Sequence, residues 1–397
     1  MTIADGLVLL ANTKEDLRVK LDMPKSAPFS TYVDSPLIPF TPRKLFSTGA
    51  EGVWYDPSDL STLFQDATGT KPVTANGDPV GLMLDKSKGL ELGVELTNDG
   101  EFTTNSWFVV NDGSYWIDGT YRVADIGGAD SYMSQKILGT EIGKLYKIDI
   151  SLLENTTSSL GFRIRTGINF GSAIFGDIFP NYVNNGVTTF YILAKGNDFY
   201  FSPHVSTTDT HVVIDSISIK EIKGNHATQS VSASRPTYQT DGILHWLAFD
   251  GVDDYIACVY ADIMAQPNTV AIGFNFIDGN RIFSNAASGT HRQIMYSITA
   301  GTRWYAGDLD GDVGISPSQN TIVTGEFNGT SSFYRKNGGV NTVVNSGTNN
   351  TDGVTIAADY GGQYPSNMRF YGFVSVNRQI EYNELEQYLA QKSGVTL

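Results

Sequence analysis

The sequence has little cysteine, little histidine and little charge. Its 397 residues include one cysteine, Cys258, and five histidines. A single cysteine excludes a disulfide within the chain and a zinc site built from cysteines. Because Cys258 lies in the apolar run 255–260, we expect its side chain to be buried. The histidines are scattered, and no zinc, P-loop, dinucleotide-binding or nucleophile-elbow motif stands in its required context.

Basic residues and long hydrophobic runs are also scarce. Only 17% of the residues are charged, and the net charge is −15. This balance argues against nucleic acid and against an anionic membrane surface, because both are bound chiefly through Lys and Arg. The apolar run 6–11 is too short to span a membrane and lacks a basic lead-in. We therefore expect neither membrane insertion nor an export signal.

Glycine and aromatic residues, in contrast, are abundant. The chain has 41 Gly, 20 Tyr and 21 Phe, and short alternating apolar runs recur about every ten residues, as is typical of β-sandwiches. We predict a mainly β fold of tandem antiparallel β-sandwiches (jelly rolls), with an extended N-terminal arm and a short C-terminal helix. The length favours two or three domains.

Composition divides the chain into four segments. Residues 1–44 are predicted to form an arm, with a short helix followed by a Pro-rich extended stretch. Residues 45–96 are rich in turns and short strands, residues 97–223 form one sandwich, and residues 224–397 form a second sandwich with a terminal helix. We expect that helix to begin around Glu381 and to stop at Gly394.

The segment from Thr41 to Lys86 resembles a stretch found in tail-fibre-like and other virion proteins of tailed bacteriophages. The resemblance lies in Leu45-Phe46, in Trp54-Tyr55-Asp56-Pro57-Ser58, in Leu63-Phe64-Gln65-Asp66 and in residues 79–86. It implies a structural protein of a phage particle that is made in the host cytoplasm. The arm, residues 1–44, would attach it to other virion proteins, and fibres of this kind imply a homo-oligomer, with a trimer as one form.

Residues 97–223 resemble the jelly roll of carbohydrate-binding modules. The resembling edges are residues 96–102 and residues 213–219. In that family the two edges meet and often hold a structural Ca²⁺, so Asn98, Glu101 and Asp215 would be oxygen donors, completed by carbonyls or water. The alternative is that these residues are turn and cap residues without a metal.

Residues 240–397 resemble the concanavalin A-like (laminin-G-like) sandwich. The resemblance lies in residues 247–255, 325–329, 334–338 and 369–373, together with the terminal helix. The alternating acids Asp308, Asp310 and Asp312 are typical of calcium loops, but Val313 and Gln319 replace the residues that an EF-hand requires. For Asp250, Asp253 and Asp254 we favour a turn over a metal site.

Exposed aromatic rings are the candidate sugar-binding residues, because a sugar ring stacks on an aromatic face. We select Tyr115, Trp116, Tyr200, Trp304 and Tyr305. Trp107, inside an apolar strand, is expected in a core instead.

Taken together, these patterns predict a phage virion protein of the tail-fibre or receptor-binding type. Its outward sandwiches would adhere to host-surface polysaccharide without catalysis. The alternatives are a collar, head-fibre or capsid-decoration protein without a specific ligand, and a polysaccharide-degrading enzyme that uses a carboxylate pair.

Overall fold

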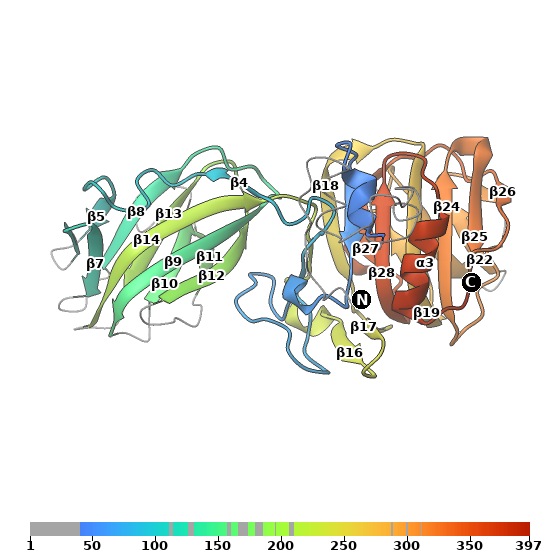
Figure 1. Cartoon of the computed structure of the whole chain (residues 1–397), viewed down its shortest axis with the longest axis horizontal. Helices are drawn as coiled ribbons and strands as arrows, with labels where there is room; N and C mark the ends of the chain where they lie inside the picture. Colours follow the sequence, from blue (N-terminus) through green and yellow to red (C-terminus); the bar gives the residue numbers. More distant parts are fainter. Residues whose placement is uncertain are drawn as a thin grey trace, which may run out of the picture. The chain divides into compact units, whose positions relative to one another are not determined.

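The computed structural model describes most of the chain from residue 40 onward (Figure 1). The described ranges are 40–110, 114–125, 131–156, 160–165, 174–178, 186–194, 196–205, 210–286, 289–298, 301–310 and 312–397. The predicted arm lies outside them except for residues 40–44, so its attachment role stays a prediction. Within these ranges, no helix is both long and apolar enough to cross a membrane.

The fold is mainly β, as the sequence predicts. Four antiparallel sheets pair into two sandwiches, and each sandwich encloses its own hydrophobic core. One core draws its residues from between Phe102 and Ile219, and the other from between Val53 and Phe373. We call the first sandwich the jelly roll and the second the C-terminal sandwich.

The jelly roll packs a six-stranded sheet against a five-stranded sheet. The six-stranded sheet runs β12-β9-β14-β7-β6, with β4 beside β14, and the five-stranded sheet runs β11-β10-β13-β8-β5. The strands are β4 (Leu92–Glu95), β5 (Phe108–Val110), β6 (Tyr115–Ile117), β7 (Thr120–Asp125), β8 (Ser131–Ile137), β9 (Leu145–Asn155), β10 (Leu160–Arg165), β11 (Ile174–Ile178), β12 (Gly186–Leu193), β13 (Phe199–Val205) and β14 (Thr210–Ile222).

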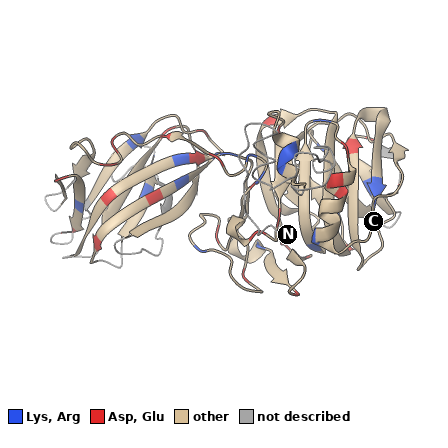
Figure 2. Ribbon diagram, in the orientation of Figure 1, with Lys and Arg blue, Asp and Glu red and all other residues tan. Residues whose placement is uncertain are grey.

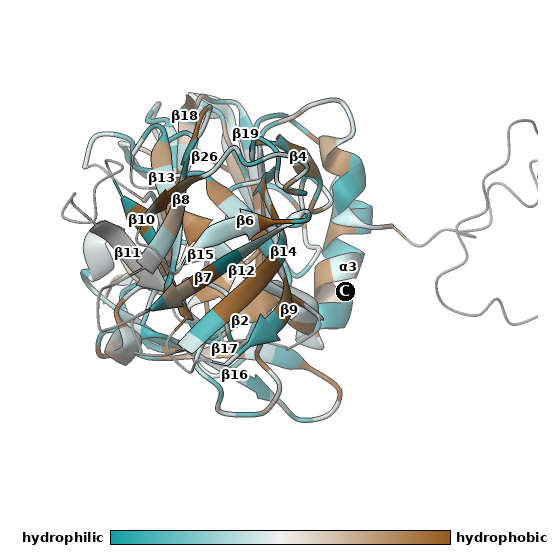
Figure 3. Cartoon of the chain, turned by 90° about the vertical axis from the view of Figure 1, so that its left-hand side faces the viewer, coloured by the Kyte–Doolittle hydropathy of each residue, from teal (hydrophilic) through white to brown (hydrophobic). Residues whose placement is uncertain are grey.

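Alternation of apolar and polar residues fixes which face of each strand enters the jelly-roll core. In β14, Val212 and Ile214 point inward, and a register shift after Ile214 lets Ile217 and Ile219 do the same. Figure 3 shows hydrophilic and hydrophobic residues alternating along such strands. Trp107 is 3% exposed and lies in this core, as predicted.

The C-terminal sandwich packs an eight-stranded sheet against a nine-stranded sheet. The first runs β16-β17-β28-β19-β24-β25-β26, with β1 beside β28, and the second runs β2-β3-β15-β18-β27-β20-β21-β22-β23. The strands of the first are β1 (Gly52–Tyr55), β16 (Thr237–Thr240), β17 (His245–Asp250), β19 (Asn268–Gly279), β24 (Asn320–Phe327), β25 (Ser332–Lys336), β26 (Thr342–Val344) and β28 (Ser366–Val376). Those of the second are β2 (Leu63–Phe64), β3 (Leu82–Met83), β15 (Ala227–Thr228), β18 (Ile256–Met264), β20 (Arg281–Ser284), β21 (Ile294–Ile298), β22 (Gly301–Tyr305), β23 (Leu309–Asp310) and β27 (Thr351–Ile356).

Short 3₁₀ turns and one α-helix complete the described elements. The turns are η1 (Pro42–Phe46), η2 (Leu60–Thr62), η3 (Ser232–Ser234), η4 (Gly329–Ser331) and η5 (Tyr360–Gly362). The helix is α3 (Asn383–Ser393), and the left-handed φ of 68° at Gly394 ends it, as predicted. Its N-cap is Tyr382 rather than Glu381, and no side chain caps it.

The turn-rich segment 45–96 supplies strands to the C-terminal sandwich. Strand β1 pairs with β28, and β2 and β3 extend the nine-stranded sheet through β15. Val53, Tyr55 and Met83 are buried in the same core as Phe373. The C-terminal sandwich is therefore built from two stretches of chain, and the jelly roll is inserted between them.

The two chain crossings of this insertion lie side by side. Strand β4 pairs with the end of β14, with Glu95 opposite Lys220. Beside them, the backbone N–H of Lys223 donates to the carbonyl of Glu91 at 2.8 Å. Residues 91 and 223, which are 132 positions apart in the sequence, are thus hydrogen-bonded neighbours.

Asp85 joins the two crossings to β1. Its carboxylate accepts hydrogen bonds from the backbone N–H groups of Trp54 and Asn225, both at 2.8 Å. Burial raises the pKa of Asp85 to about 6, although these hydrogen bonds act in the opposite direction. Next to it His226 is buried, and burial lowers the pKa of its ring to about 4.

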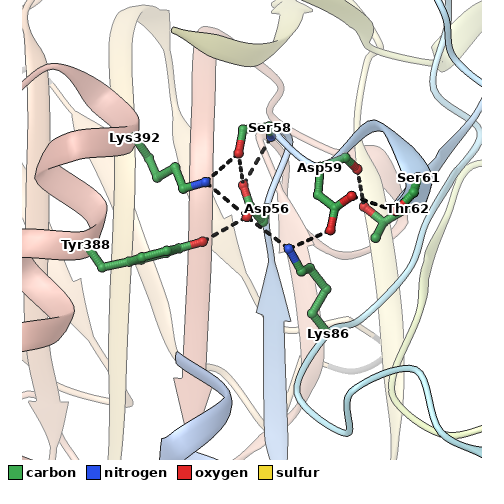
Figure 4. A network of polar contacts seen from close by, with 8 residues as sticks. All are labelled: Asp56, Ser58, Asp59, Ser61, Thr62, Lys86, Tyr388 and Lys392. Carbon is green, nitrogen blue, oxygen red and sulfur yellow. Dashed lines mark hydrogen bonds and ion pairs between the residues drawn. The ribbon is translucent and has the colours of Figure 1, made fainter. Parts of the chain in front are cut away.

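A buried polar network attaches α3 to the N-terminal strands (Figure 4). Asp56 accepts from Lys86 Nζ at 3.1 Å, Lys392 Nζ at 3.2 Å and Tyr388 Oη at 2.8 Å, and Lys86 also pairs with Asp59 at 2.7 Å. Burial alone would raise the pKa of Asp56, but the two lysine charges lower it to about 2. The network therefore holds together residues more than 300 positions apart in the sequence.

Candidate functional site

The aromatic residues predicted for sugar binding occupy three different environments. Tyr115, on the β6–β7 hairpin, is 45% exposed, and the Arg122 guanidinium lies 5.8 Å from its ring. Trp116 points the other way. Its ring packs against the jelly-roll core, and its indole N–H donates to the carbonyl of Phe102 at 2.8 Å. Trp116 is therefore a partly buried structural residue in this structure, whereas Tyr115 offers a ring to solvent.

Tyr200 lies on the outer face of the five-stranded sheet. It is partly exposed, with Arg165 of β10 and Lys136 of β8 opposite it on the neighbouring strands. Arg165 is fully buried, and its guanidinium lies 4.5 Å from the ring centre of Tyr132. Tyr132 is itself only 4% exposed, so this face is covered around Arg165, and sugar binding by Tyr200 stays a prediction.

Trp304 and Tyr305 are neighbours in β22 but face opposite sides of the sheet. Trp304 is 0% exposed and stacks on Phe327, with ring centres 4.4 Å apart. It has no free face for a sugar, so the structure corrects this prediction: Trp304 is a core residue. Tyr305 is partly exposed, and its ring lies 6.2 Å from that of Tyr296 on β21.

The outward face around Tyr305 carries a cross-strand row of arginine and tyrosine. Arg281 of β20 lies opposite Tyr296 of β21, which in turn lies opposite Arg303 of β22. We call Arg281, Tyr296, Arg303, Tyr305 and Tyr364 the Arg–Tyr ladder. All five are at least partly exposed, while Met295 and Trp304, which alternate with them, are fully buried.

Arg281 is held in place by two aromatic rings and a carboxylate. Its guanidinium lies 4.8 Å from the ring centre of Tyr296 and 4.9 Å from that of Tyr364. Its Nε donates to Asp359 at 3.0 Å, and Arg292 donates to the same carboxylate oxygen at 2.7 Å. Tyr364 is 57% exposed, and its carbonyl accepts from the backbone N–H of Arg281 at 3.3 Å. Rings and guanidinium therefore form a platform of fixed geometry.

Arginine charges act on the pKa values of Asp359 and Tyr296 at the ladder. Burial alone would raise the pKa of Asp359, but a hydrogen bond from Ser284 and the charges of Arg281 and Arg292 hold it below its ordinary value. Burial raises the pKa of Tyr296, while Arg281, Arg303 and Arg292 all act to lower it. Three guanidinium groups therefore lie within electrostatic reach of one tyrosine hydroxyl.

Two of the three residues expected to bind calcium, Asn98 and Asp215, make hydrogen bonds within the protein. The two edges of the jelly roll do meet, because the backbone N–H of Ile217 donates to the carbonyl of Gly100 at 2.9 Å. The backbone N–H of Asn98 donates to the side-chain Oε1 of Gln135 at 2.8 Å, and Nε2 of Gln135 donates to the carbonyl of Asn98 at 2.6 Å. The Asp215 carboxylate accepts from Ser151 at 3.2 Å. Calcium at Asn98, Glu101 and Asp215 stays a prediction.

Two other acidic groups behave as turn residues. The carboxylate oxygens of Asp250, Asp253 and Asp254 lie within 4.8 Å of one another. They accept hydrogen bonds from the turn itself and from Ser234, and burial together with the Asp250 charge raises the pKa of Asp254 to about 7.

In the loop 308–312, Asp312 accepts from the backbone N–H groups of Thr302 and Gly314, both at 2.8 Å, and Asp308 from Asn345 at 2.8 Å. Residue 311 and the side chain of Asp310 lie outside the described residues.

Sequence reasoning selected Tyr305 but missed the other four residues of the ladder. Arg281, Tyr296 and Arg303 each alternate with apolar neighbours, and that pattern indicates an outward position. Alternation does not reveal that β20, β21 and β22 are adjacent or in which register they pair. The ladder therefore emerges only from the strand pairing.

Comparisons with known proteins found weak structural similarity only. No family model and no curated protein sequence matches the chain. Among solved structures, a Trypanosoma rangeli sialidase matches at 14% identity and a TM-score of 0.30, covering 42% of this chain and 30% of its own.

The same enzyme with the inhibitor DANA matches at 10% identity and a TM-score of 0.31, covering 67% of this chain and 61% of its own. A truncated AlyQ with CBM32 and alginate lyase domains matches at 9% identity and a TM-score of 0.26, covering 76% and 98%. The chain thus spans less than two thirds of either sialidase chain, and at these TM-scores we draw nothing from the similarities.

Proposed function

We propose that the chain is a structural protein of a phage particle, of the tail-fibre or receptor-binding type, that adheres to host-surface glycan without catalysis. Two observations support the proposal. The stretch 41–86 resembles virion proteins, and the C-terminal sandwich presents the Arg–Tyr ladder on an outward face. The ladder carries the proposal, because aromatic and guanidinium groups occupy positions where core packing does not require them.

The ladder suits a sugar chain chemically. Tyr305 and Tyr364 offer aromatic faces for the apolar side of a sugar ring, and the arginines offer N–H donors for hydroxyl oxygens. A shallow platform of this kind gives modest affinity at a single site. Many copies on one particle raise the overall avidity, since each further contact is effectively intramolecular. Attachment through residues 1–44 and a homo-oligomer, for which a trimer is one form, would supply those copies.

A glycan array tests the adhesion. We expect binding by the full chain that falls at least tenfold in Tyr305→Ala and in Tyr364→Ala, while the free energy of unfolding falls by about 1 kcal/mol or less. Tyr115→Ala is the matched variant, because it removes an exposed tyrosine beside an arginine on the jelly roll. Loss of binding in Tyr115→Ala alone would move the site to the jelly roll, and binding to no glycan would defeat the proposal.

Antibody labelling of intact particles in the electron microscope tests the location. We expect label on the tail or its fibres. Label confined to the head would contradict the fibre assignment and support a head-fibre or decoration role. New reducing ends after incubation with capsule or lipopolysaccharide would contradict a non-catalytic role.

A further inference from the structure

We propose that the Arg–Tyr ladder selects acidic sugars, in which a ring carboxylate is bound by arginine while the ring stacks on tyrosine. This inference rests on the proposed function and names the ligand class of the same site. A guanidinium fork matches the geometry of a carboxylate through two parallel N–H···O bonds.

Two arginines share one carboxylate at the ladder. The chain as a whole is acidic, with 42 Asp and Glu against 27 Lys and Arg. At the ladder, Arg281 and Arg292 share the carboxylate of Asp359, so this group of three side chains carries two positive charges against one negative charge. Arg303 lies opposite Tyr296 on the next strand. An anion that approaches Arg281 and Arg292 therefore meets a group with a net positive charge.

The geometry of the Arg281 side chain is already fixed. The Arg281 side chain is 11% exposed and lies between the rings of Tyr296 and Tyr364. Asp359 is itself held by Ser284 at 2.6 Å and by the backbone N–H of Tyr360 at 3.0 Å. A guanidinium fixed in this way loses little rotamer freedom when it binds an anion, which favours affinity.

Aromatic rings lie beside guanidinium groups in the ladder. Tyr305 and Tyr364 are the ladder's aromatic faces, and Tyr296 separates Arg281 from Arg303 across neighbouring strands about 4.8 Å apart. A sugar ring on a tyrosine can therefore direct its carboxylate toward an arginine of the adjacent strand. A neutral sugar gains the stacking contact but not the ion pair.

Paired polysaccharides with and without charge test the inference. The probes are polygalacturonate, alginate, hyaluronan and polysialic acid, each compared with its methyl ester by surface plasmon resonance on the full chain. We expect at least one acid to bind tenfold or more tightly than its ester. That preference should weaken as salt is raised to about 0.5 M, where the screening length is only a few ångströms.

Two ladder variants and one matched control sharpen the test. Arg303→Gln and Arg281→Gln should reduce binding of the acid to the level of its ester. Since Arg281 also contacts Asp359, Arg303→Gln carries the test if Arg281→Gln fails to fold. Arg369→Gln is the control, because Arg369 lies 4.9 Å from the Trp246 ring on the other sheet and its loss changes net charge equally. It should leave the preference unchanged.

The outcomes separate the inference from the proposed function. Equal binding of acids and esters, with loss in Tyr305→Ala, would overturn acid selection and leave glycan adhesion intact. Binding to neutral glycans on the array, together with no binding to any of the four acids, would also overturn acid selection and leave glycan adhesion intact. Binding to no glycan of either kind would overturn both.

Discussion

The two sandwiches differ in how the chain supplies them. The jelly roll takes its core from one continuous stretch between Phe102 and Ile219, whereas the C-terminal sandwich combines strands from both sides of that insertion. Polar contacts reinforce the second arrangement, because Asp56 binds Lys392 and Tyr388 of the terminal helix. A continuous domain can fold from its own residues, while a discontinuous one depends on chain that lies far away in the sequence.

Their outer faces differ as well. On the six-stranded sheet of the jelly roll, side chains of opposite charge form ion pairs. Lys147 Nζ lies 2.6 Å from the carboxylate of Asp149, and Lys220 Nζ lies 3.6 Å from that of Glu95. Figure 2 shows blue and red segments next to each other on the strands of this sandwich. Such solvated pairs contribute little and keep a surface soluble. The ladder instead combines arginine with aromatic rings. This difference is why we propose the C-terminal sandwich as the site of adhesion.

Removing the N-terminal strands should have the largest effect. A chain of residues 224–397 lacks six core residues: Val53, Tyr55, Leu63, Val73, Val80 and Met83. Each buried side chain contributes roughly 1.5–3 kcal/mol, so their sum rivals the roughly 5–15 kcal/mol of a whole domain. We expect this fragment not to fold and residues 91–223 to unfold cooperatively on their own, as measured by circular dichroism. A stable 224–397 fragment would contradict the discontinuous sandwich.

Adjacent substitutions in β22 should separate stability from binding. Trp304→Ala removes a fully buried ring and should destabilise the protein by about 3–5 kcal/mol. Tyr305→Ala should cost about 1 kcal/mol or less, because its ring is on the surface, yet it should weaken glycan binding. Urea unfolding and glycan binding measured on both variants would check this. Comparable destabilisation by the two would argue against the assigned faces.

Breaking the Asp56 network should have a somewhat smaller effect. Asp56→Asn leaves Lys86 and Lys392 without their buried partner, whose side chain is 4% exposed, and should cost about 3 kcal/mol. Asp59→Asn is the matched variant, since Asp59 binds the same Lys86 from a side chain that is 32% exposed. It should cost at most about 1 kcal/mol. Equal losses in urea unfolding would show that burial of the network is unimportant.

The pH dependence of stability follows from the same carboxylate and should be the smallest effect. The pKa of Asp56 is lowered from 3.8 to about 2 on folding. Its stabilisation is therefore complete above about pH 4 and is lost as the pH falls from about 4 to about 2, by about 2 kcal/mol. The stability difference between wild type and Asp56→Asn should narrow over this window. A constant difference down to pH 2 would contradict the lowered pKa.

Local patterns in the sequence predicted much of the fold. Alternation predicted strands such as β14, burial of Cys258 is confirmed at 5% exposure, and Gly394 does end the terminal helix. These features depend on neighbouring residues alone. The membership of β1 in the C-terminal sandwich was not predicted, because a four-residue strand does not specify a partner at residues 373–376.

The candidate site was predictable only in part, for the same reason. Tyr305 stood out as an aromatic residue beside an acidic loop, but so did Trp304, and only the strand geometry shows which of them faces solvent. Arg281 and Arg303 belong to the candidate site only because strand pairing places them on either side of Tyr296. Register between distant strands is a tertiary property that composition does not encode.

Excising the jelly roll tests the central claim most directly. Since Lys223 and Glu91 are already hydrogen-bonded, an Asn-Gly turn can replace residues 92–222. The excision uncovers Leu82 and Leu84, which pack with Leu145, Tyr191 and Ile222, so a modest loss of stability is expected. We predict that the excised chain still unfolds cooperatively and binds the same glycan within about threefold of the full chain. An excised chain that folds but no longer binds would contradict adhesion through the Arg–Tyr ladder, and one that cannot fold would contradict the inserted jelly roll.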